Sequence, residues 1–310
     1  MSSAGLAGAT EARVVAQAKV NLVLRVLARE ASGFHQLETL FQRIELGDEV
    51  RVRVGGSACT LDCGGADVGP VERNLAWRAA QTFAARTGWP RDFAIEIVKR
   101  IPVGGGLGGG SADAGAVLRC LNALAPAPLT PTELLRIAAP LGSDVPFLAA
   151  ESPLALAWGR GERMLALPPL ESRDVVLALF DHGVATPDAY RWLAESRVAH
   201  PSPEPRLLAV DALASWDAIA AIAENDFERV VLPRHQGAAR AHAALRQAGH
   251  PVVLLSGSGA TVFAVDAMAA VPPAAGPAGP QLRYIRTRTA ACVAPVEIAP
   301  LPAPQEHGYL

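Results

Sequence analysis

Residues 101–122 read IPVGGGLGGGSADAGAVLRCLN, and glycine occupies six of the seven positions from Gly104 to Gly110. Before this stretch, residues 93–99 alternate apolar and polar side chains, which predicts a strand with one buried face. After it, apolar residues recur at helical spacing from Ser111 onward, which predicts a helix. Glycine lets bare backbone N–H groups converge, and the unpaired N–H groups of a first helical turn attract anions. The strand, loop and helix together predict a nucleotide-phosphate site.

Three alternative roles for the glycine stretch fit its surroundings less well. Gly104 and Gly109 belong to a G-x-G-x-x-G pattern, but a dinucleotide-binding unit also needs a strand and an acidic residue about 20 positions on. Here residues 129–139 predict a second helix with Thr130 as its N-cap. A Walker A loop needs lysine before its serine or threonine, whereas Ser111 follows glycine. A purely structural turn would not need six glycines, each of which loses much backbone entropy on folding, so a phosphate loop is favoured.

Lys19, Asn21 and Asp144 are polar residues whose types suit acid–base chemistry near a phosphate. Residues 13–27 predict a strand, so Lys19 and Asn21 share one of its faces, about 7 Å apart. Spacing alone favours an exposed polar strand face for this pair. For Asp144, the favoured interpretation of an isolated aspartate is that it, or Ser143, caps the short turn that follows.

Phe34 and His35 follow a turn at Gly33 and combine a flat apolar ring with a group that both donates and accepts hydrogen bonds. Such a pair suits a nucleobase, which needs stacking on its face and polar contacts along its edge. The more ordinary interpretation of Phe34 is a core residue.

Composition indicates a globular enzyme with reduced thiols. The 310 residues suit one large domain or two closely packed ones, and the formal net charge of −2 provides no field that would attract nucleic acid or a membrane surface. Apolar runs such as residues 175–180 are far too short to span a bilayer, and the first residues lack the pattern of a secretory signal. The four cysteines lack the spacing of a metal site, so we expect free thiols and a cytoplasmic location.

The rest of the chain predicts strands and helices on both sides of a domain boundary at residues 168–169, which are Pro-Pro. This boundary gives domains 1–167 and 168–310. One predicted helix, residues 218–231, contains the sequence Glu-Asn-Asp-Phe-Glu. The other predicted elements are strands at 41–44, 49–54, 154–158, 162–167, 175–180, 252–255, 261–265 and 284–288, helices at 75–86 and from Thr186, and an Ala/Pro/Gly-rich loop at 268–280.

Several of these stretches, taken together, resemble the GHMP kinases, a family of small-molecule kinases. The strand sequence AKVNLVLRVL, the loop sequence PVGGGLGGGSADAG and the late sequence SGSGATVF look like the three motifs of that family. Further similar stretches are GFHQLETLFQRIELGDEV, RNLAWRAA, LGSDVPF, WGRGER, TPDAY and NDFE, so the likeness runs from about Ala18 to Val265. The resemblance implies an α+β fold of two domains, the first like domain 2 of ribosomal protein S5 and the second ferredoxin-like, with the active site in the cleft between them.

The resemblance also implies the chemistry. GHMP kinases transfer the γ-phosphate of ATP to an alcohol, and the details here are similar to those members whose alcohol carries a cytidine diphosphate group. Asp144 matches the family's catalytic aspartate, and Lys19 matches the lysine beside it. The positions that match the substrate side are Asn21, Phe34, His35 and Thr186. The positions that match the nucleotide side are Asn74, Lys99, Pro102, Val103, Gly104, Gly105, Gly106, Leu107, Gly108, Gly109, Gly110, Ser111 and Ala112.

These assignments agree with what phosphoryl transfer requires. An alcohol that attacks a phosphoryl group needs alignment, neutralised charge and a proton acceptor. Asp144 would accept the proton, while Lys19 would stabilise negative charge beside it. Mg²⁺ is the expected cofactor beside ATP, with Ser111 as a candidate ligand. The expected partners are these small molecules, without nucleic acid or membrane, for a chain that acts as a monomer or weak homodimer.

The chain departs from the family pattern at a few positions. Phe34 stands where tyrosine is common, and Ala112 and Gly115 replace a serine and an alanine at the start of the helix. Two other functions remain open: a GHMP kinase for another alcohol, such as mevalonate or homoserine, and a non-catalytic binding protein with this fold. Phe34 and His35 together argue against the first, and the presence of both Lys19 and Asp144 argues against the second.

Overall fold

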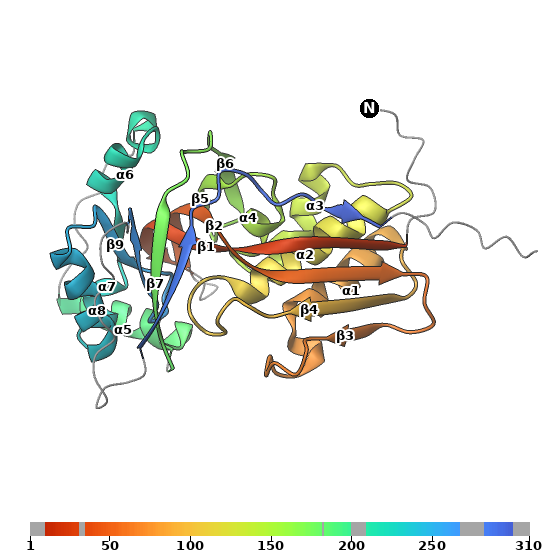
Figure 1. The fold of residues 1–310 in the computed structure, drawn as a ribbon, viewed down its shortest axis with the longest axis horizontal. Helices are drawn as coiled ribbons and strands as arrows, with labels where there is room; N and C mark the ends of the chain where they lie inside the picture. The colour runs from red at the N-terminus through yellow and green to blue at the C-terminus, as the bar shows by residue number, and fades with distance from the viewer. Residues whose placement is uncertain (1–9, 31–34, 182, 200–208, 267–281, 300–310) are drawn as a thin grey trace, which may run out of the picture.

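The computed structural model describes residues 10–30, 35–181, 183–199, 209–266 and 282–299, and it has the expected α+β fold, built on two sheets (Figure 1). One sheet has eight strands and the other has four. In Figure 1 the larger sheet extends to the right, with its helices, and the smaller sheet lies to the left with a second set of helices. Within the described part of the chain, every helix is too short or too polar to cross a bilayer. All four cysteines are free thiols.

The larger sheet is organised around two long antiparallel strands, β1 (Glu11–Arg29) and β2 (His35–Val54). They pair along most of their length, with three irregularities in register, two of which flank the segment from Lys19 to Asn21. Residues 49–54 of β2 pair with β4, and residues 37–42 pair with β5, so this one strand joins two parts of the sheet. The other strands of this sheet are β3 (Thr60–Asp62), β4 (Phe93–Val98), β5 (Leu154–Gly159), β6 (Arg163–Ala166), β8 (Glu224–Asn225) and β12 (Glu297–Ile298).

The two strands predicted at 41–44 and 49–54 are therefore parts of one strand, and the break between them was wrong. Gly47, in the gap between the two predicted strands, lies within β2. A Cβ at this position would lie 2.6 Å from Val15 Cγ1 and 2.9 Å from the carbonyl oxygen of Ala16. Glycine here permits close approach of two backbones, which is a common reason for glycine inside a strand.

Helix α2 is the central helix of the layer that packs on this sheet. It contacts β1 and β2 as well as the other three helices of the layer. Its N-cap is Gly108, directly after the glycine loop. The predicted N-cap Thr130 is confirmed, since it forms a capping box with Glu133 at the start of α3. The helices of this layer are α1 (Leu75–Thr87), α2 (Gly109–Leu124), α3 (Pro131–Ala138) and α4 (Val145–Ala149).

The smaller sheet has the strand order β11-β7-β10-β9, and three of its strands, β7, β9 and β10, are buried on both faces. In β7, Val175 and Leu177 belong to a core shared with the larger sheet, whereas Ala178 belongs to a second core that includes residues of α5, α7 and α8. Burial on both faces explains why the sequences of β7, β9 and β10 are continuous apolar runs. The elements of this region are β7 (Asp174–Phe180), β9 (Val252–Leu255), β10 (Val262–Val265), β11 (Leu282–Arg288), α5 (Thr186–Ala199), α6 (Trp216–Ile222), α7 (Glu228–Val231) and α8 (Gln236–Gln247).

Two late segments of the chain return to β1. β8 pairs with it in parallel, and β12 pairs with it in antiparallel orientation. In addition, the side chain of Gln17 accepts the N–H of Ala294 at 2.9 Å and donates to the carbonyl of Cys292 at 3.2 Å. The domain boundary predicted at residues 168–169 falls in the connection between β6 and β7, and it stays a prediction.

The predicted helix over residues 218–231 was wrong. α6 ends at Ile222, β8 follows, and α7 begins only at Glu228. The pattern is helical, but the side chain of Asn225 accepts the N–H of Phe227, and its backbone pairs with β1. These contacts outweigh local helix propensity, which is a weak preference. The loop predicted at 268–280 lies outside the described residues.

We expect Gly115→Ala, in α2, to lower the free energy of unfolding. An added Cβ would lie 2.5 Å from the carbonyl carbon and oxygen of Leu148 in α4. Overpacking of this kind costs about 1–3 kcal/mol. Gly110→Ala is the matched control in the same helix, because its nearest neighbour would be Leu75 Cδ1 at 3.9 Å; it should stabilise by roughly 0.4–1 kcal/mol. Urea unfolding measures both changes, and a Gly115→Ala protein as stable as the wild type would contradict the close packing of α2 on α4.

Candidate active site

A cavity of about 820 Å³ opens where the larger sheet, its helix layer and the start of α5 meet. Its walls come from the glycine loop, β1, β2, the residues before α4, the first turns of α5 and the loop between β9 and β10. The volume falls in the range of ligand-binding clefts, about 300–1,000 Å³.

The loop between β4 and α2 has the backbone geometry of an anion site. Gly104, Gly106 and Gly108 have φ angles of 77°, 76° and 74°, a left-handed conformation that residues with side chains disfavour. Alternation of left-handed and ordinary residues turns successive N–H groups toward one side of a loop. Because Gly108 is the N-cap of α2, the positive end of that helix joins the same region. The predicted strand, glycine loop and helix are thus confirmed as elements, in a geometry suited to phosphate.

A second glycine-rich loop, residues 256–259, packs directly against the first. Ser256 Oγ donates to the carbonyl of Gly106 at 3.0 Å. A Cβ on Gly106 would lie 2.1 Å from the carbonyl oxygen of Ser256, so a larger residue would push the two loops apart. Two motifs 150 residues apart in the sequence therefore form one wall of the cavity.

Lys19 and Asn21 are buried, with 3% and 2% of their surface exposed, so their interpretation as an exposed polar face was wrong. The glycine loop covers them, and the backbone N–H of Lys19 donates to the carbonyl of Leu107. Lys19 Nζ donates to Asn21 Oδ1 at 2.8 Å and lies 3.3 Å from Asp144 Oδ2. Asn21 Nδ2 in turn donates to Thr39 Oγ1 at 2.8 Å. These side chains form a continuous polar chain that ends at the cavity.

Asp144 directly precedes α4, but its side chain makes no capping hydrogen bond, so the capping interpretation was wrong. The carboxylate pairs with Lys19 and lines the cavity, with 29% of the side chain exposed. The other end of α4 is held by Arg43, whose guanidinium donates to the carbonyls of Phe147 and Ala150 at 2.8 and 2.9 Å. Burial lowers the pKa of Arg43 to about 9, so it still carries its charge at neutral pH.

Lys99 lines the cavity at the base of the glycine loop, but its charge is matched within the protein. Its Nζ lies 2.7 Å from Asp113 Oδ2 and 2.5 Å from Asp48 Oδ2. Asp48 Oδ1 accepts the N–H groups of Arg100 and Ile101, which fixes the chain as it enters the loop. Burial raises the pKa of Asp113 to about 7, and its Oδ1 has no hydrogen-bond partner among the described residues. Lys99 therefore helps to hold the base of the glycine loop, through its contacts with the carboxylates of Asp48 and Asp113.

An aromatic group lies on another side of the cavity. The rings of His35 and Tyr190 stack with centroids 4.2 Å apart and planes at 19°. Phe227 packs edge-on against Tyr190 at 4.9 Å. Burial, with a smaller contribution from the charge of Asp144, raises the pKa of Tyr190 to about 12. The aromatic group is thus within electrostatic reach of the Lys19–Asp144 pair, and Tyr190 keeps its proton at neutral pH.

Most of the predicted site residues share this cavity. Those that line it are Lys19, Asn21, His35, Asn74, Lys99, Asp144, Thr186 and every residue from Pro102 to Ser111. Asn74 also accepts the N–H of Ala76 as the N-cap of α1, and Thr186 Oγ1 shares a hydrogen bond with Ser258 Oγ at 2.9 Å. Ala112 is buried in the hydrophobic core instead. Phe34 lies outside the described residues.

Sequence reasoning missed Thr39, Asp113 and Tyr190, which all line the cavity. Tyr190 could have been found, because it follows Thr186 by four residues and so shares its face of α5. Thr39 reaches Asn21 only through an irregular register between β1 and β2. Asp113 lies in the site because the side chain of Lys99 reaches it on α2. Neither of these two placements can be read from local spacing.

Comparison with known proteins agrees with this geometry. Residues 74–151 match the family model described as GHMP kinases N terminal domain. A 4-diphosphocytidyl-2-C-methyl-D-erythritol kinase from Pelotomaculum thermopropionicum is 38% identical over 258 residues, which cover 82% of this chain and 88% of that protein. The kinase of the same name from Anaeromyxobacter dehalogenans is 42% identical over 257 residues, covering 81% and 79%. A solved structure of 4-(cytidine 5'-diphospho)-2C-methyl-D-erythritol kinase is similar with a TM-score of 0.68 and 32% identity, covering 90% of this chain and 99% of that one.

The chain belongs to the GHMP kinases, and it is an ATP-dependent small-molecule kinase. The relatives just described, all more than 30% identical, carry the name 4-diphosphocytidyl-2-C-methyl-D-erythritol kinase or its equivalent. A homoserine kinase from Cytophaga hutchinsonii is also similar in structure, with a TM-score of 0.62 over 96% of this chain and 99% of that one. At 17% identity, that likeness shows the fold alone.

We expect Gly106→Ala to weaken ATP binding about tenfold or more, because the new Cβ displaces the 256–259 loop from the glycine loop. Gly104→Ala is the matched control: its φ of 77° gives the same left-handed strain, about 1–2 kcal/mol, but nothing lies within 4 Å of the added Cβ. Calorimetric titration with a non-hydrolysable ATP analogue measures both. Equal affinities in the two variants would show that contact between the loops does not matter for ATP.

Proposed function

We propose that the chain transfers the γ-phosphate of ATP to the 2-hydroxyl of 4-diphosphocytidyl-2-C-methyl-D-erythritol. The observation that carries this proposal is the Lys19–Asp144 pair, in one cavity with an anion-type glycine loop and an aromatic group suited to a nucleobase. The names of the relatives support this choice of alcohol. Mevalonate and homoserine carry no nucleobase, so a kinase for either alcohol would not need an aromatic group to bind it. A non-catalytic binding protein would have no need of a buried lysine–aspartate pair.

In the proposed reaction, the 2-oxygen of the alcohol forms a bond to the γ-phosphorus, and the bond from that phosphorus to the β,γ-bridging oxygen breaks, releasing ADP. Asp144 accepts the proton of the hydroxyl. Lys19, held by Asn21 at 2.8 Å, stabilises the negative charge that develops beside Asp144. Because the lysine is buried, water screens its charge little.

The glycine loop and the N-terminus of α2 hold the phosphates of ATP in this proposal, through backbone N–H groups. Asp48 and Asp113, through Lys99, keep the base of the loop in place. A transferring phosphoryl group must lie in line with the attacking oxygen, so a rigid loop contributes directly to the rate.

Mg²⁺ is the proposed metal, bound mainly by ATP. Among the residues that the structure describes, no cluster of three or more acidic, histidine or cysteine side chains could hold a metal by itself. Mg²⁺ fits this site nonetheless, because it is usually held by one or two protein ligands together with phosphates and water. Ser111, in the first turn of α2 and lining the cavity, is the proposed protein ligand. When bound, the ion would neutralise phosphate charge.

His35 and Tyr190 recognise the cytosine in this proposal. With ring centroids 4.2 Å apart, no third ring fits between them, so a base that stacks on Tyr190 must displace the imidazole. The displaced imidazole would then turn its ring nitrogens toward the polar edge of the base. Phe34 and Thr186 are also proposed to contact this substrate. We further propose that the chain acts in the cytoplasm as a monomer or weak homodimer, without nucleic acid or membrane partners.

Asp144→Asn should lower kcat by a factor of about 10²–10⁴, the usual contribution of a general base, because the amide keeps the shape but cannot accept the proton. The affinity for ATP should stay within about twofold, since the glycine loop is untouched. Asp188→Asn, which changes an exposed carboxylate on α5, is the matched control and should leave kcat unchanged. ADP release and ATP titration measure the two quantities, and undiminished turnover would remove Asp144 from the mechanism.

Tyr190→Ala and His35→Ala should each raise KM for the cytidyl substrate roughly tenfold to a hundredfold, with KM for ATP nearly unchanged. Tyr190→Phe is the matched control, because it keeps the ring and should keep a KM within about threefold of the wild type. The measurement is steady-state kinetics with the cytidyl alcohol, mevalonate and homoserine in parallel. Turnover of mevalonate or homoserine in place of the cytidyl alcohol would overturn the proposed substrate.

A further inference from the structure

The segment Glu224–Glu228 has the sequence Glu-Asn-Asp-Phe-Glu. Two of its side chains, Asn225 and Glu228, hold the start of the second glycine loop, and two, Asp226 and Phe227, contact α5. None of these side chains has a role in the proposed chemistry. The segment is β8 and the start of α7, and β8 pairs with β1 at Val23 and Leu24, a few residues beyond Lys19. It therefore lies at the point where the strand that carries the lysine meets the helices around Tyr190.

Asn225 is buried and holds the second glycine loop. Its side-chain amide donates to the carbonyls of Leu255 and Gly257, both at 2.8 Å, and accepts the N–H of Phe227 at 2.9 Å. An asparagine amide has two donor hydrogens and one acceptor oxygen, and all are used here. Glu228 adds a further contact, because its carboxylate accepts the N–H of Leu255 at 2.8 Å.

The residue that Asn225 holds, Gly257, lies directly beside Lys19 and the first glycine loop. A Cβ on Gly257 would lie 3.4 Å from Lys19 Nζ and 3.2 Å from the carbonyl oxygen of Gly106. The carbonyl of Gly257 that Asn225 holds thus fixes a loop that touches both the lysine and the phosphate loop. Aspartate in place of Asn225 would lose both donors to these carbonyls.

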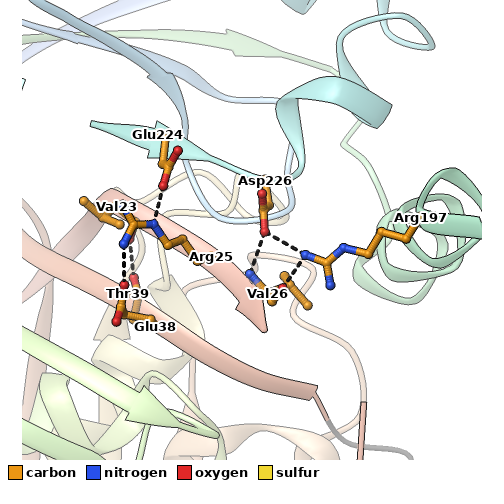
Figure 2. A network of polar contacts seen from close by, with 8 residues as sticks. All are labelled: Val23, Arg25, Val26, Glu38, Thr39, Arg197, Glu224 and Asp226. Atoms are coloured by element: carbon orange, nitrogen blue, oxygen red, sulfur yellow. Dashed lines mark hydrogen bonds and ion pairs between the residues drawn. The ribbon is translucent and has the colours of Figure 1, made fainter. Parts of the chain in front are cut away.

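Asp226 holds α5. Figure 2 shows its carboxylate between the N–H of Val26 and the guanidinium of Arg197, and Oδ2 accepts from them at 2.8 and 2.9 Å. Arg197 also donates to the carbonyl of Val26. Because Arg197 follows Tyr190 by seven residues, two helical turns, both lie on the same face of α5. The Asp226–Arg197 pair therefore sets the rotation of the helix that presents Tyr190.

Two other contacts support the same arrangement. Phe227 packs edge-on against the Tyr190 ring at 4.9 Å. In Figure 2, Arg25 of β1 lies between Glu224 and Glu38, and its Nη1 donates to Glu38 at 2.7 Å. The segment is thus tied to β1 on one side and to α5 on the other.

We infer that Glu224–Glu228 is a positioning element that sets the two walls of the active site separately: Asn225 and Glu228 place the loop that touches Lys19 and the phosphate loop, and Asp226 places Tyr190. The inference deepens the proposed function and rests on it. It predicts that substitutions one residue apart have different kinetic signatures, because one acts on the transfer step and the other on the binding of the base.

The test compares two nearly isosteric substitutions. Asn225→Asp should lower kcat about tenfold to a hundredfold, the effect of losing one or two buried hydrogen bonds, with KM for the cytidyl alcohol within about twofold. Asp226→Asn should raise that KM about tenfold, with kcat within about threefold, because the charge that holds Arg197 is lost. Arg197→Gln should reproduce the Asp226→Asn result.

A second pair keeps the loop side testable if Asn225→Asp does not fold. Glu228→Ala removes the acceptor for the N–H of Leu255 and should lower kcat alone, whereas Glu228→Gln keeps an acceptor oxygen and should restore kcat to near the wild-type value. Melting temperatures of all variants identify any that are simply unfolded.

Amide hydrogen exchange gives a readout that does not depend on the substrate. Asn225→Asp should raise exchange in residues 255–259 and not in α5, and Asp226→Asn should do the reverse. Kinetic constants that move together in both variants, or exchange that rises equally in both segments, would overturn the inference. A wild-type protein that does not phosphorylate the cytidyl alcohol would overturn the proposed function instead, and the exchange pattern would still decide the inference.

Discussion

The burial of the Lys19 ammonium group is the constraint on which the rest of the site depends. A buried charge is costly unless it is paired and hydrogen-bonded. Here Asn21 and Asp144 supply the partners, and the Phe41 ring centroid lies 5.6 Å from Nζ. A Cβ on Gly108 would lie 3.1 Å from Lys19 Cγ and Cε, so the first glycine loop closes over the stem of the lysine as the second closes over its head. The glycines that leave room for phosphate also leave room for this side chain.

Rigid placement of Asp144 follows from how α4 is held. Gly115 lets α2 approach the backbone of α4, and Arg43 binds the carbonyls at the far end of the same helix. Arg43 has no carboxylate partner among the described residues, and backbone carbonyls take its donors instead. A five-residue helix has little stability of its own, so these tertiary contacts must hold it. Asp144, at the start of this helix, is therefore positioned through contacts made near its other end, without which the helix would not form.

Local sequence determined much of the fold. The strand, glycine loop and helix from residue 93 onward, the capping box at Thr130 and the hairpin of β5 and β6 all follow from short-range patterns, and the structure contains each of them. Long-range contacts decided what the sequence could not. The burial of Lys19 comes from a loop that begins more than eighty residues later, and the loss of the predicted helix over 218–231 comes from the pairing of β8 with β1. In the candidate site, the motifs located most of the residues of the cavity, but not Thr39, Asp113 or Tyr190.

The return of β12 to β1 links the active site to the order in which the ribosome makes the chain. Among the residues that the structure describes, the side chain of Gln17, two residues before Lys19, forms its hydrogen bonds with the backbone of residues 292 and 294. Contacts between such distant positions form late, because the intervening chain must first be made and its ends brought together. During synthesis, the edge of β1 at Ala12 and Arg13 therefore stays unpaired until residues 297–298 have emerged. A nascent chain stopped before that point would keep its glycine loops and Asp144 but would leave this strand edge open, and an open strand edge can pair with another chain and aggregate.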